Sequence, residues 1–167
     1  MSTVFKLANG NVYTPTNKLA GRASEVDFGE LPVNFSDYKG LGMLGDMEIP
    51  NGFGKIEAKV KFNTFFINEM GVSPNQATTL VFRGNSEGYE GSGKVSDTGI
   101  IITMTGVVKN FPFGSFKGNE MSNLELKYSI YSAKVTVGGQ DLWEYDVTSN
   151  TFKVKGVDQN AAWKLNT

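Results

Sequence analysis

The stretch KIEAKVKF, residues 55–62, decides the fold class of this chain. Every second residue is apolar, and the positions between them carry lysine or glutamate. Successive side chains of a strand point to opposite faces, so this spacing predicts a β-strand with one buried face and one solvated face. The residues expected on the buried face are Ile56, Ala58, Val60 and Phe62.

The same period of two continues in NLELKYSI, residues 123–130, and then changes phase. Apolar residues occupy even positions up to Ile130 and odd positions from Tyr131 to Val137. Such a change predicts either a β-bulge or one strand that serves two different surroundings. The pair Gly138-Gly139 then predicts a tight hairpin turn. Further strands are expected at QDLWEYDV and TFKVKG.

Only one segment shows clear helical spacing. Residues 64–70 predict a helix of about two turns, with Asn63 or Thr64 as its cap and Gly71 at its end. The predicted fold class is therefore all-β, a mostly antiparallel sandwich or barrel with one short α-helix near 64–70. The length suits a single domain over residues 1–167.

The stretch GIIITM, residues 99–104, is apolar at almost every position. An antiparallel strand with one wet face does not need apolar residues on both sides. We therefore expect both of its faces to be covered, either within the fold or by an assembly partner. Trp143 and Trp163 are expected to serve as packing residues.

Composition removes most catalytic chemistry. The chain has no cysteine and no histidine, which excludes disulfides, thiolate or imidazole metal ligands and a Ser-His-Asp triad. Its net charge of −1 provides no basic excess to hold nucleic acid by phosphate neutralisation. We expect no catalytic residue, no cofactor and no metal. No secretory signal or apolar stretch long enough for a membrane helix is found, so synthesis in a cytoplasm without membrane insertion is expected.

A glycine motif, GLGMLG at residues 40–45, has the G-x-G-x-x-G spacing of a dinucleotide-binding loop. That function requires a buried strand before the motif and a helix after it. Here Pro50, Gly52 and Gly54 follow and disfavour a helix. The favoured interpretation is a β-hairpin arm at about 34–54, whose apolar tip contacts another molecule.

A second long loop carries three aromatic residues, Phe111, Phe113 and Phe116. Loops normally lie on the surface, and exposed phenylalanines there predict a covering partner. Two pairs of acids, Asp46 with Glu48 and Glu144 with Asp146, each stand two residues apart on expected strands. A paired-acid hydrolase would need one buried acid with a shifted pKa, so a solvated strand face is favoured.

The order and spacing of several motifs over residues 20–160 resemble the major tail tube proteins of contractile-tailed phages and R-type pyocin-like particles. The arm differs from the family pattern at Leu41, Leu44 and Asp46, and Phe116 stands where tryptophan is common. The segments that carry the resemblance are YKGLGMLGDMEI (38–49), GFGKIEAKVKF (52–62), VFRG (81–84), GVVKNFPFGSFKGNE (106–120), KVTVGGQDLWEYDV (134–147) and KVKGVDQ (153–159).

The resemblance implies a structural virion protein of the inner tail tube. Copies would form hexameric rings whose sheets join into one ring-shaped barrel, and the rings would stack into a hollow conduit for DNA. Polar, not strongly basic side chains would line the lumen. The implied partners are the tail sheath protein, a baseplate initiator, a tape-measure protein and a tail terminator, with DNA only as passing cargo.

The resemblance also implies roles for the two apolar segments. The glycine arm would reach a neighbouring subunit in the same or an adjacent ring, and the phenylalanine loop would be a second contact. GIIITM would lie between the barrel and an outer layer. The arm residues expected at this contact are Tyr38, Gly40, Leu41, Gly42, Met43, Leu44 and Met47.

Other functions stay open at the level of sequence. The tube could belong to an infective phage, a headless pyocin-like particle or a secretion system whose rings pass effectors. A monomeric β-sandwich binding module is a further alternative. A carboxylate hydrolase using Glu48 or Glu144 is the last.

Overall fold

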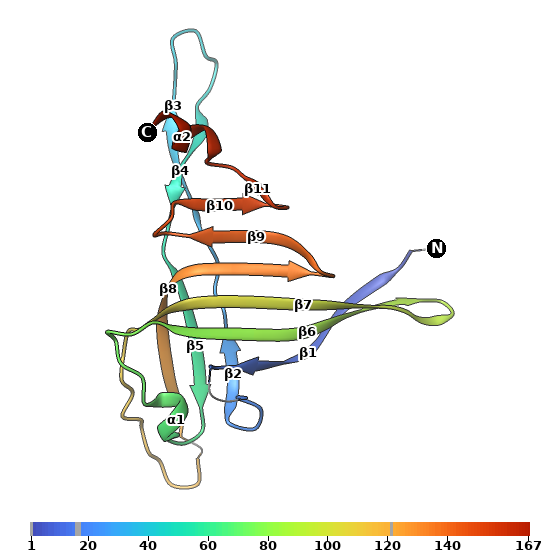
Figure 1. Cartoon of the computed structure of the whole chain (residues 1–167), viewed down its shortest axis with the longest axis vertical. Helices are drawn as coiled ribbons and strands as arrows, with labels where there is room; N and C mark the ends of the chain where they lie inside the picture. The colour runs from blue at the N-terminus through green and yellow to red at the C-terminus, as the bar shows by residue number, and fades with distance from the viewer. Residues whose placement is uncertain (1, 16–17, 121) are drawn as a thin grey trace.

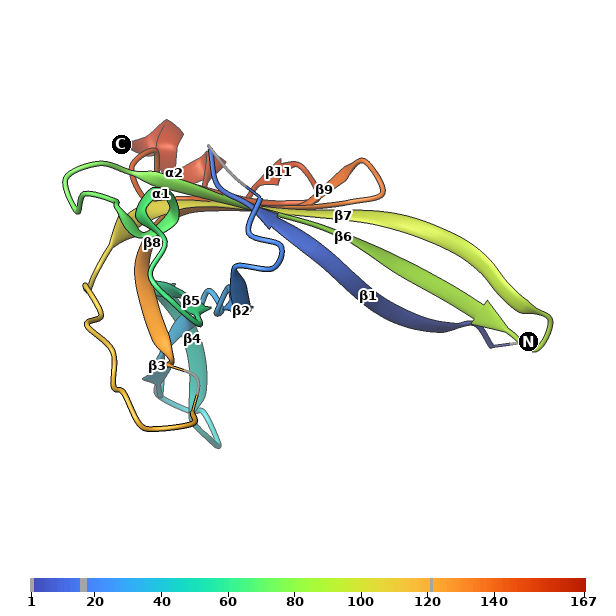
Figure 2. The ribbon, with the colours of Figure 1, turned by 90° about the horizontal axis from the view of Figure 1, so that it is seen from below.

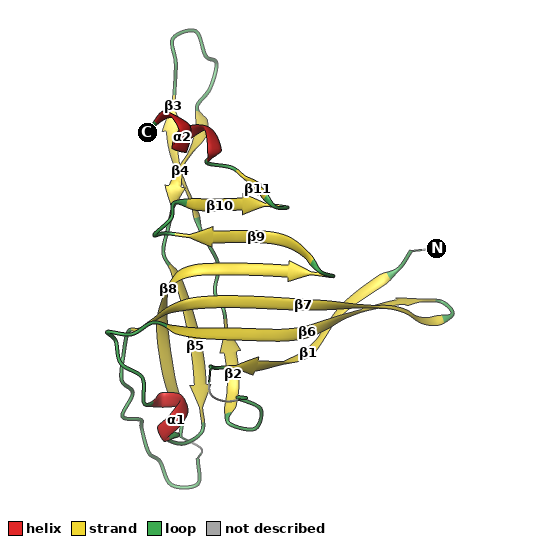
Figure 3. Ribbon diagram, in the orientation of Figure 1, coloured by secondary structure: helices red, strands yellow, loops and turns green. Residues whose placement is uncertain are grey.

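The computed structural model describes residues 2–15, 18–120 and 122–167, and most of its regular structure is antiparallel β-sheet (Figure 3). A main sheet has the strand order β1-β6-β7-β8-β9-β10-β11 (Figure 1). The all-β prediction is confirmed. The strands of this sheet are β1 (Val4–Tyr13), β6 (Thr78–Glu90), β7 (Gly93–Val108), β8 (Leu124–Val137), β9 (Gln140–Asp146), β10 (Thr151–Val154) and β11 (Val157–Asp158).

A second layer forms because β8 bends out of the main sheet (Figure 2). The first half of β8 pairs with β5 (Ile56–Phe62), which in turn pairs with β2 (Ala23–Asp27). Pairing with β5 ends at Ile130, and pairing with β9 begins at Ser132. Tyr131 is the extra residue of a bulge against β7. The change of phase in the sequence therefore marks both a bulge and a change of surroundings.

The bulge requires glycine on the neighbouring strand. Gly106 of β7 lies opposite Ile130, and a Cβ atom added there would overlap the backbone carbonyl of Ser129. Two backbones can approach this closely only where one residue lacks a side chain. Gly106 thus permits β8 to leave the main sheet at this point.

The hydrophobic core lies between the second layer and the main sheet. All four apolar residues of the KIEAKVKF stretch are buried, with exposed fractions of 3% or less, as predicted. Leu124 and Leu126 of β8 are equally buried, and burial raises the pKa of Tyr128 to about 12. The main sheet contributes Leu80, Met104 and Val108 to this cluster.

Strand register gives the main sheet two different faces. Leu80 pairs with Met104, which pairs with Ala133 and then Tyr145, so these residues share the face toward the second layer. We call this the apolar face. The residues between them form the polar face, on which the equivalent row is Thr79, Thr105, Ser132 and Asp146.

This arrangement corrects the expectation for GIIITM. Ile100, Ile102 and Met104 lie on the apolar face. On the polar face, Ile101 lies between Arg83 and Thr136, and Thr103 lies between Val81 and Lys134. Only Ile101 departs from ordinary alternation. The stretch is therefore an alternating strand with one apolar exception, not a strand that is apolar on both sides.

The described part of the chain contains two short helices, whereas the sequence showed clear helical spacing for one of them. Helix α1 spans Ile67–Met70, and α2 spans Ala161–Asn166. The predicted caps at Asn63 and Thr64 are wrong, because those residues form a bend after β5 and the N-cap of α1 is Phe66, an extended residue whose ring packs 5.9 Å from that of Phe62. The predicted end is confirmed, since the Gly71 N–H donates to the Ile67 carbonyl at 2.9 Å. Neither helix in the described part of the chain is long and apolar enough to cross a membrane.

Candidate self-association surfaces

The first candidate surface is a hairpin that stands apart from the rest of the fold. Strands β3 (Val33–Tyr38) and β4 (Met47–Phe53) form a separate two-stranded sheet, with Tyr38 opposite Met47. We call residues 33–53 the arm and residues 39–46 the arm tip. The arm extends well beyond the main sheet (Figure 1). Of its two strands, only Phe53 is not exposed.

The arm tip shows what the GLGMLG motif does. The Met43 N–H donates to the Gly40 carbonyl at 3.2 Å, and Gly42 has a φ of 84°, which favours glycine. The residues that follow form β4 and not a helix. A dinucleotide loop needs a helix N-terminus at this place, so the motif is the turn of a hairpin.

The predicted contact residues are indeed accessible. Leu41 and Leu44 are completely exposed, and Tyr38 and Met47 are about half exposed. Sequence reasoning missed three further exposed apolar residues of the arm, although their position within a predicted hairpin was a usable signal. These are Val33, Phe35 and Ile49.

The second candidate surface is the loop between β7 and β8, which we call the Phe loop (residues 109–120). Its start is fixed by Asn110, whose side-chain amide donates to the Glu125 carbonyl at 2.9 Å and accepts from the Lys127 N–H at 2.7 Å. The phenylalanines beyond that anchor are only partly covered within the chain. Phe111, Phe113 and Phe116 are 53%, 85% and 70% exposed.

The structure does not bring these two surfaces together. The arm tip lies at one end of the longest axis, and the Phe loop lies at the other end (Figure 1). Burying large apolar side chains is favourable by about 1.5–3 kcal/mol each. Two uncovered apolar segments at opposite ends therefore favour contacts with other molecules.

The edges of the main sheet form a third candidate surface. In the described part of the chain, β1 pairs along one side with β6 and otherwise only through a bridge from Tyr13 to Lys18. At the other end, β11 pairs with β10 at Lys153 and Val154, and the Gln159 N–H just after β11 donates to the Phe152 carbonyl at 2.8 Å. Unpaired strand edges expose N–H and C=O groups that can pair with another strand.

The polar face of the main sheet carries balanced charge. Lys94 bridges Glu87 at 2.8 Å and Asp97 at 2.7 Å, and Lys134 lies 3.4 Å from Asp141. These contacts raise the pKa of Lys94, while hydrogen bonds, chiefly from Lys94, lower the pKa values of Glu87 and Asp97. Bases and acids thus alternate over this face without a basic cluster.

The outer face of the second layer is also mixed in charge. Glu57 binds Lys109 at 2.7 Å, which lowers the pKa of that carboxyl, and Lys61 binds Glu25 at 3.0 Å. Paired lysines do not form a free basic stripe. This face therefore lacks the electrostatic pattern of a nucleic-acid groove.

The acid pairs do not have the geometry of a paired-acid site. Asp46 and Glu48 are both exposed on the arm. Asp146 accepts hydrogen bonds from the Thr148 hydroxyl and N–H at 2.7 and 2.8 Å, which lowers the pKa of its carboxyl. A general acid needs the opposite shift, so Asp146 organises the turn after β9. Among the described residues, no cluster of three acidic side chains is arranged to hold a metal ion.

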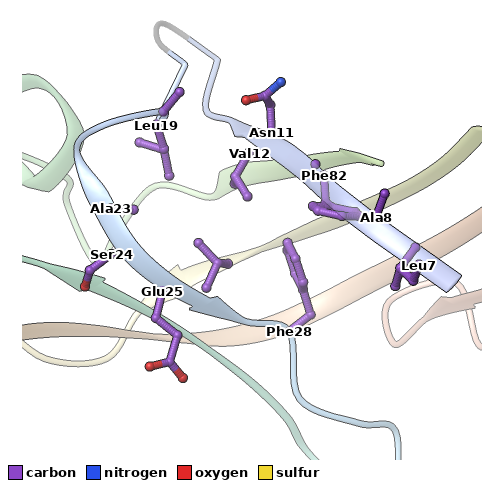
Figure 4. Close-up of a pocket in the computed structure, with 13 residues that line it drawn as sticks. Leu7, Ala8, Asn11, Val12, Leu19, Ala23, Ser24, Glu25, Phe28 and Phe82 are labelled. Atoms are coloured by element: carbon purple, nitrogen blue, oxygen red, sulfur yellow. The ribbon is translucent and has the colours of Figure 1, made fainter. Parts of the chain in front are cut away.

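An open hollow of about 400 Å³ lies between β1 and β2 (Figure 4). Its walls are mostly apolar, including Leu19, Phe28 and Phe82. Glu25 is its only acid, and the carboxylate points away from the hollow toward Lys61 (Figure 4). No pair of reactive groups converges there.

A second apolar groove, of about 380 Å³, lies where the arm joins the main sheet. Phe53 of β4 and Trp143 of β9 both line it. Trp143 is 53% exposed and Trp163 is 54% exposed, so the prediction that both are packing residues is wrong. For Trp143 the reason is positional, because the apolar face near β9 and β10 extends beyond the second layer that covers the rest, and Trp163 lies on the terminal helix α2.

In the described part of the chain, two sheet edges without a neighbouring strand, a charge-balanced face and uncovered apolar projections are typical of a protein that assembles with other copies or partners. The family model for phage tail tube protein FII matches residues 5–166, and the chain belongs to that family. A comparison with curated protein sequences finds no match.

Solved structures share the fold. A chain of the PVC sheath–tube complex of an extracellular contractile injection system, in its extended state, has a TM-score of 0.54 at 11% identity and covers 76% of this chain and 87% of its own. The sheath/tube terminator of the PVC system gives 0.56 at 9% identity, covering 76% and 92%. The tube-terminating cap of the anti-feeding prophage gives 0.52 at 9% identity, covering 76% and 87%.

Proposed function

We propose that this protein is the structural subunit of the inner tube of a contractile tail, assembled as stacked hexameric rings. The observation that carries the proposal is the main sheet, which combines two free edges with one polar face of balanced charge. Membership of the tail tube family supports the same role. The role is mechanical, and none of the side-chain groups described above needs to act as a catalyst.

In this proposal the rings close through the sheet edges. The β10–β11 edge of one copy pairs with the β1 edge of the next, so the main sheets join into one barrel. Closure removes both free edges of the main sheet, which prevents disordered aggregation through β1 and β11. A barrel of so many strands is too wide for side chains to fill and therefore encloses a channel.

The polar face lines the channel, and the second layer lies outside it. Arg83 and Lys134 on that face are offset by acids such as Glu87 and Asp141. DNA would pass along such a wall without being held, because tight binding requires a surplus of phosphate-neutralising cations. Acidic and basic side chains that lie close together keep the channel wall hydrated, and they create no strong electrostatic field of one sign.

Partners follow from the same role. A sheath would surround the tube, a baseplate ring would start it, a tape-measure protein would set its length and a terminator would stop it, because heterologous stacking does not end by itself. The similar chains in sheath–tube and terminator complexes support the sheath and the terminator. The tube would be assembled in a bacterial cytoplasm and would end in the tail of the particle.

A second candidate is the tube of a headless particle that carries protein effectors. The similar solved structures come from an extracellular contractile injection system and an anti-feeding prophage, which favours this possibility. The contents of particles purified from the native source would separate the two candidates. Encapsulated DNA would support the phage tail tube, and encapsulated effector protein would support the headless particle.

Electron microscopy of the purified recombinant protein, together with its mass in solution, tests the proposal. We expect hollow rings or tubes of uniform width and a mass that is a multiple of the 18.2 kDa chain. A species that stays monomeric at millimolar concentration, alone and with its baseplate initiator, would contradict the proposal.

A further inference from the structure

We propose that helix α2 of one copy crosses the seam where two copies of the ring meet and covers the end of β1 in the next copy, on the channel side. This inference rests on the proposed function, in which the β10–β11 edge meets the β1 edge of a neighbour. It adds a contact between two apolar features of the polar face. The donor side chain is Trp163 of α2, and the acceptor is the pair Tyr13 and Val81.

Helix α2 lies on the polar face of the main sheet. Its Lys164 ammonium donates to the Thr151 hydroxyl at 3.1 Å and to the Asp158 carboxylate at 3.0 Å. Thr151 is paired with Asp146, which belongs to the polar face, and Asp158 is paired with Lys153 on the same face. Figure 2 likewise shows α2 on the side of the main sheet away from β5. In the proposed ring, α2 therefore lies inside, where no second layer covers it.

The helix also extends past the edge of the sheet. Figure 1 shows α2 beyond β11, at the end of the strand order opposite to β1. Neighbouring strands lie about 4.7–4.9 Å apart, and a helix with its side chains is about 10–12 Å wide. A helix at this place reaches over about two further strand positions. A neighbour that joins the β11 edge fills those positions with its own β1 and β6.

The helix presents apolar side chains that its own chain does not cover. Trp163 is 54% exposed and Leu165 is 87% exposed, whereas Lys164 between them is bonded to the sheet. The lysine contacts hold the helix in place, so Trp163 has a defined position. A water-filled channel provides no partner for an indole ring, and burial of such a ring removes about 150–250 Å² from water.

The neighbouring edge carries a matching apolar exception on the polar face. Tyr13 of β1 pairs with Val81 of β6 on that face, and both side chains are only partly buried. The Lys18 ammonium lies 6.0 Å from the centre of the Tyr13 ring. An indole packs well against a phenol ring, and its face attracts an ammonium group. This patch lies where β1 ends and β6 begins, at the same end of the strands as α2 (Figure 1).

Backbone pairing alone leaves this part of the seam unfilled. The Leu19 N–H donates to the Val12 carbonyl at 2.8 Å, and Lys18 forms a bridge with Tyr13. The last residues of β1 therefore already have a local partner on the side that faces the neighbour. Strand β11 of that neighbour can pair only with earlier residues of β1. A contact through α2 covers the end that the strands cannot join.

Disulfide trapping tests the contact directly, because the chain has no cysteine. Trp163→Cys and Tyr13→Cys are placed in one chain, the protein is assembled and oxidised, and the products are separated on a denaturing, non-reducing gel. The two positions of one chain lie at opposite edges of the main sheet, so a bond between them joins two copies. A disulfide forms only when the two Cα atoms come within about 7 Å.

We expect a ladder of covalent species that stops at the ring size, because lateral contacts close on themselves. The matched control is Trp163→Cys with Val4→Cys. Val4 lies on the same strand and the same face as Tyr13, opposite Tyr89, but at the far end of β1 (Figure 1). This control should yield no ladder.

Fluorescence provides an independent measurement that keeps both contact residues. Trp143→Phe leaves Trp163 as the only tryptophan. Acrylamide is small enough to enter a channel that passes DNA, so an uncovered Trp163 would stay quenchable in the tube. We expect most of the quenching to be lost on assembly. Adding Tyr13→Ser should restore part of it, whereas adding Val4→Ser should not.

The outcomes separate the inference from the proposed function. Tubes without the Trp163–Tyr13 disulfide, in which Trp163 stays quenchable, overturn the inference and leave the tube intact. A disulfide to Val4→Cys, or a ladder that continues past the ring size, places α2 against another ring and also overturns it. If the cysteine pair prevents assembly, the quenching result decides. A wild-type protein that forms neither rings nor tubes contradicts the proposed function and the inference together.

Discussion

The strands β4 and β5 have equal length, seven residues each, and follow one another almost directly in the chain. Every second residue of β5 is buried, whereas all residues of β4 except Phe53 are exposed. Strand β4 pairs only with β3, and β5 pairs with β2 and β8, but only β5 has another layer of the same chain, the main sheet, against its apolar face. Apolar residues without such a layer indicate where another molecule is needed.

The largest effect on folding stability is expected from substitutions of buried core residues. Phe62→Ala removes a side chain that is 1% exposed and should lower the free energy of unfolding by about 3–5 kcal/mol. Urea denaturation of the unassembled protein measures it. Phe113→Ala is the matched control, since this ring is 85% exposed and its loss should change unfolding by less than about 0.5 kcal/mol. Equal losses of unfolding free energy in the two variants would contradict the distinction between the buried core and the exposed Phe loop.

A smaller effect is expected where β8 leaves the main sheet. Gly106→Ala forces a Cβ atom against the Ser129 carbonyl, which should cost about 1–3 kcal/mol. Gly99→Ala, on the same strand, has open space around the added atom and should be nearly neutral. The difference in urea midpoint between the two variants checks this, and equal midpoints would contradict the role of the bulge.

Electrostatics on the polar face should contribute still less, because its groups are exposed. The pKa values of Glu87 and Asp97 are lowered from 4.5 and 3.8 by Lys94, so their contribution is present at neutral pH and is lost as the pH falls below about 4. Lys94→Met should therefore be slightly less stable than the wild type at pH 7. The difference between the two proteins should shrink steadily as the pH falls below about 4, and a difference that does not shrink would refute this account.

The arm should contribute least to folding and most to assembly. Leu41→Asp combined with Leu44→Asp replaces two fully exposed side chains, so unfolding should change by less than about 0.5 kcal/mol. Assembly should be lost, because the carboxylates cannot be buried without partners. Sedimentation and thermal unfolding of the same sample measure both. A destabilised monomer would show that the arm packs within its own chain.

Much of the fold could be predicted from local pattern. Alternation located the buried face of β5, and the change of phase at Tyr131 located the bend of β8. The start of α1 was harder to predict from the sequence. Phe66 packs against Phe62 and has an extended backbone, so the helix begins only at the next residue. A capping pattern by itself does not reveal how the neighbouring side chains pack.

The candidate surfaces were only partly predictable for the same reason. The exposed tip of the arm follows from apolar residues in a glycine-rich turn, but the exposure of Trp143 depends on where the second layer ends. Likewise, the two faces around Ile101 are set by register with β6 and β8. Sequence spacing within one strand cannot reveal which neighbouring layer covers it.

The central claim is that copies join edge to edge with the polar face inward. Cryo-electron microscopy of the assembled recombinant protein tests it most directly. The account predicts a closed ring barrel with Thr103 and Lys134 facing the lumen and the second layer outside. A reconstruction in which the apolar face or the arm lines the channel, or in which β1 remains an unpaired edge, would contradict it.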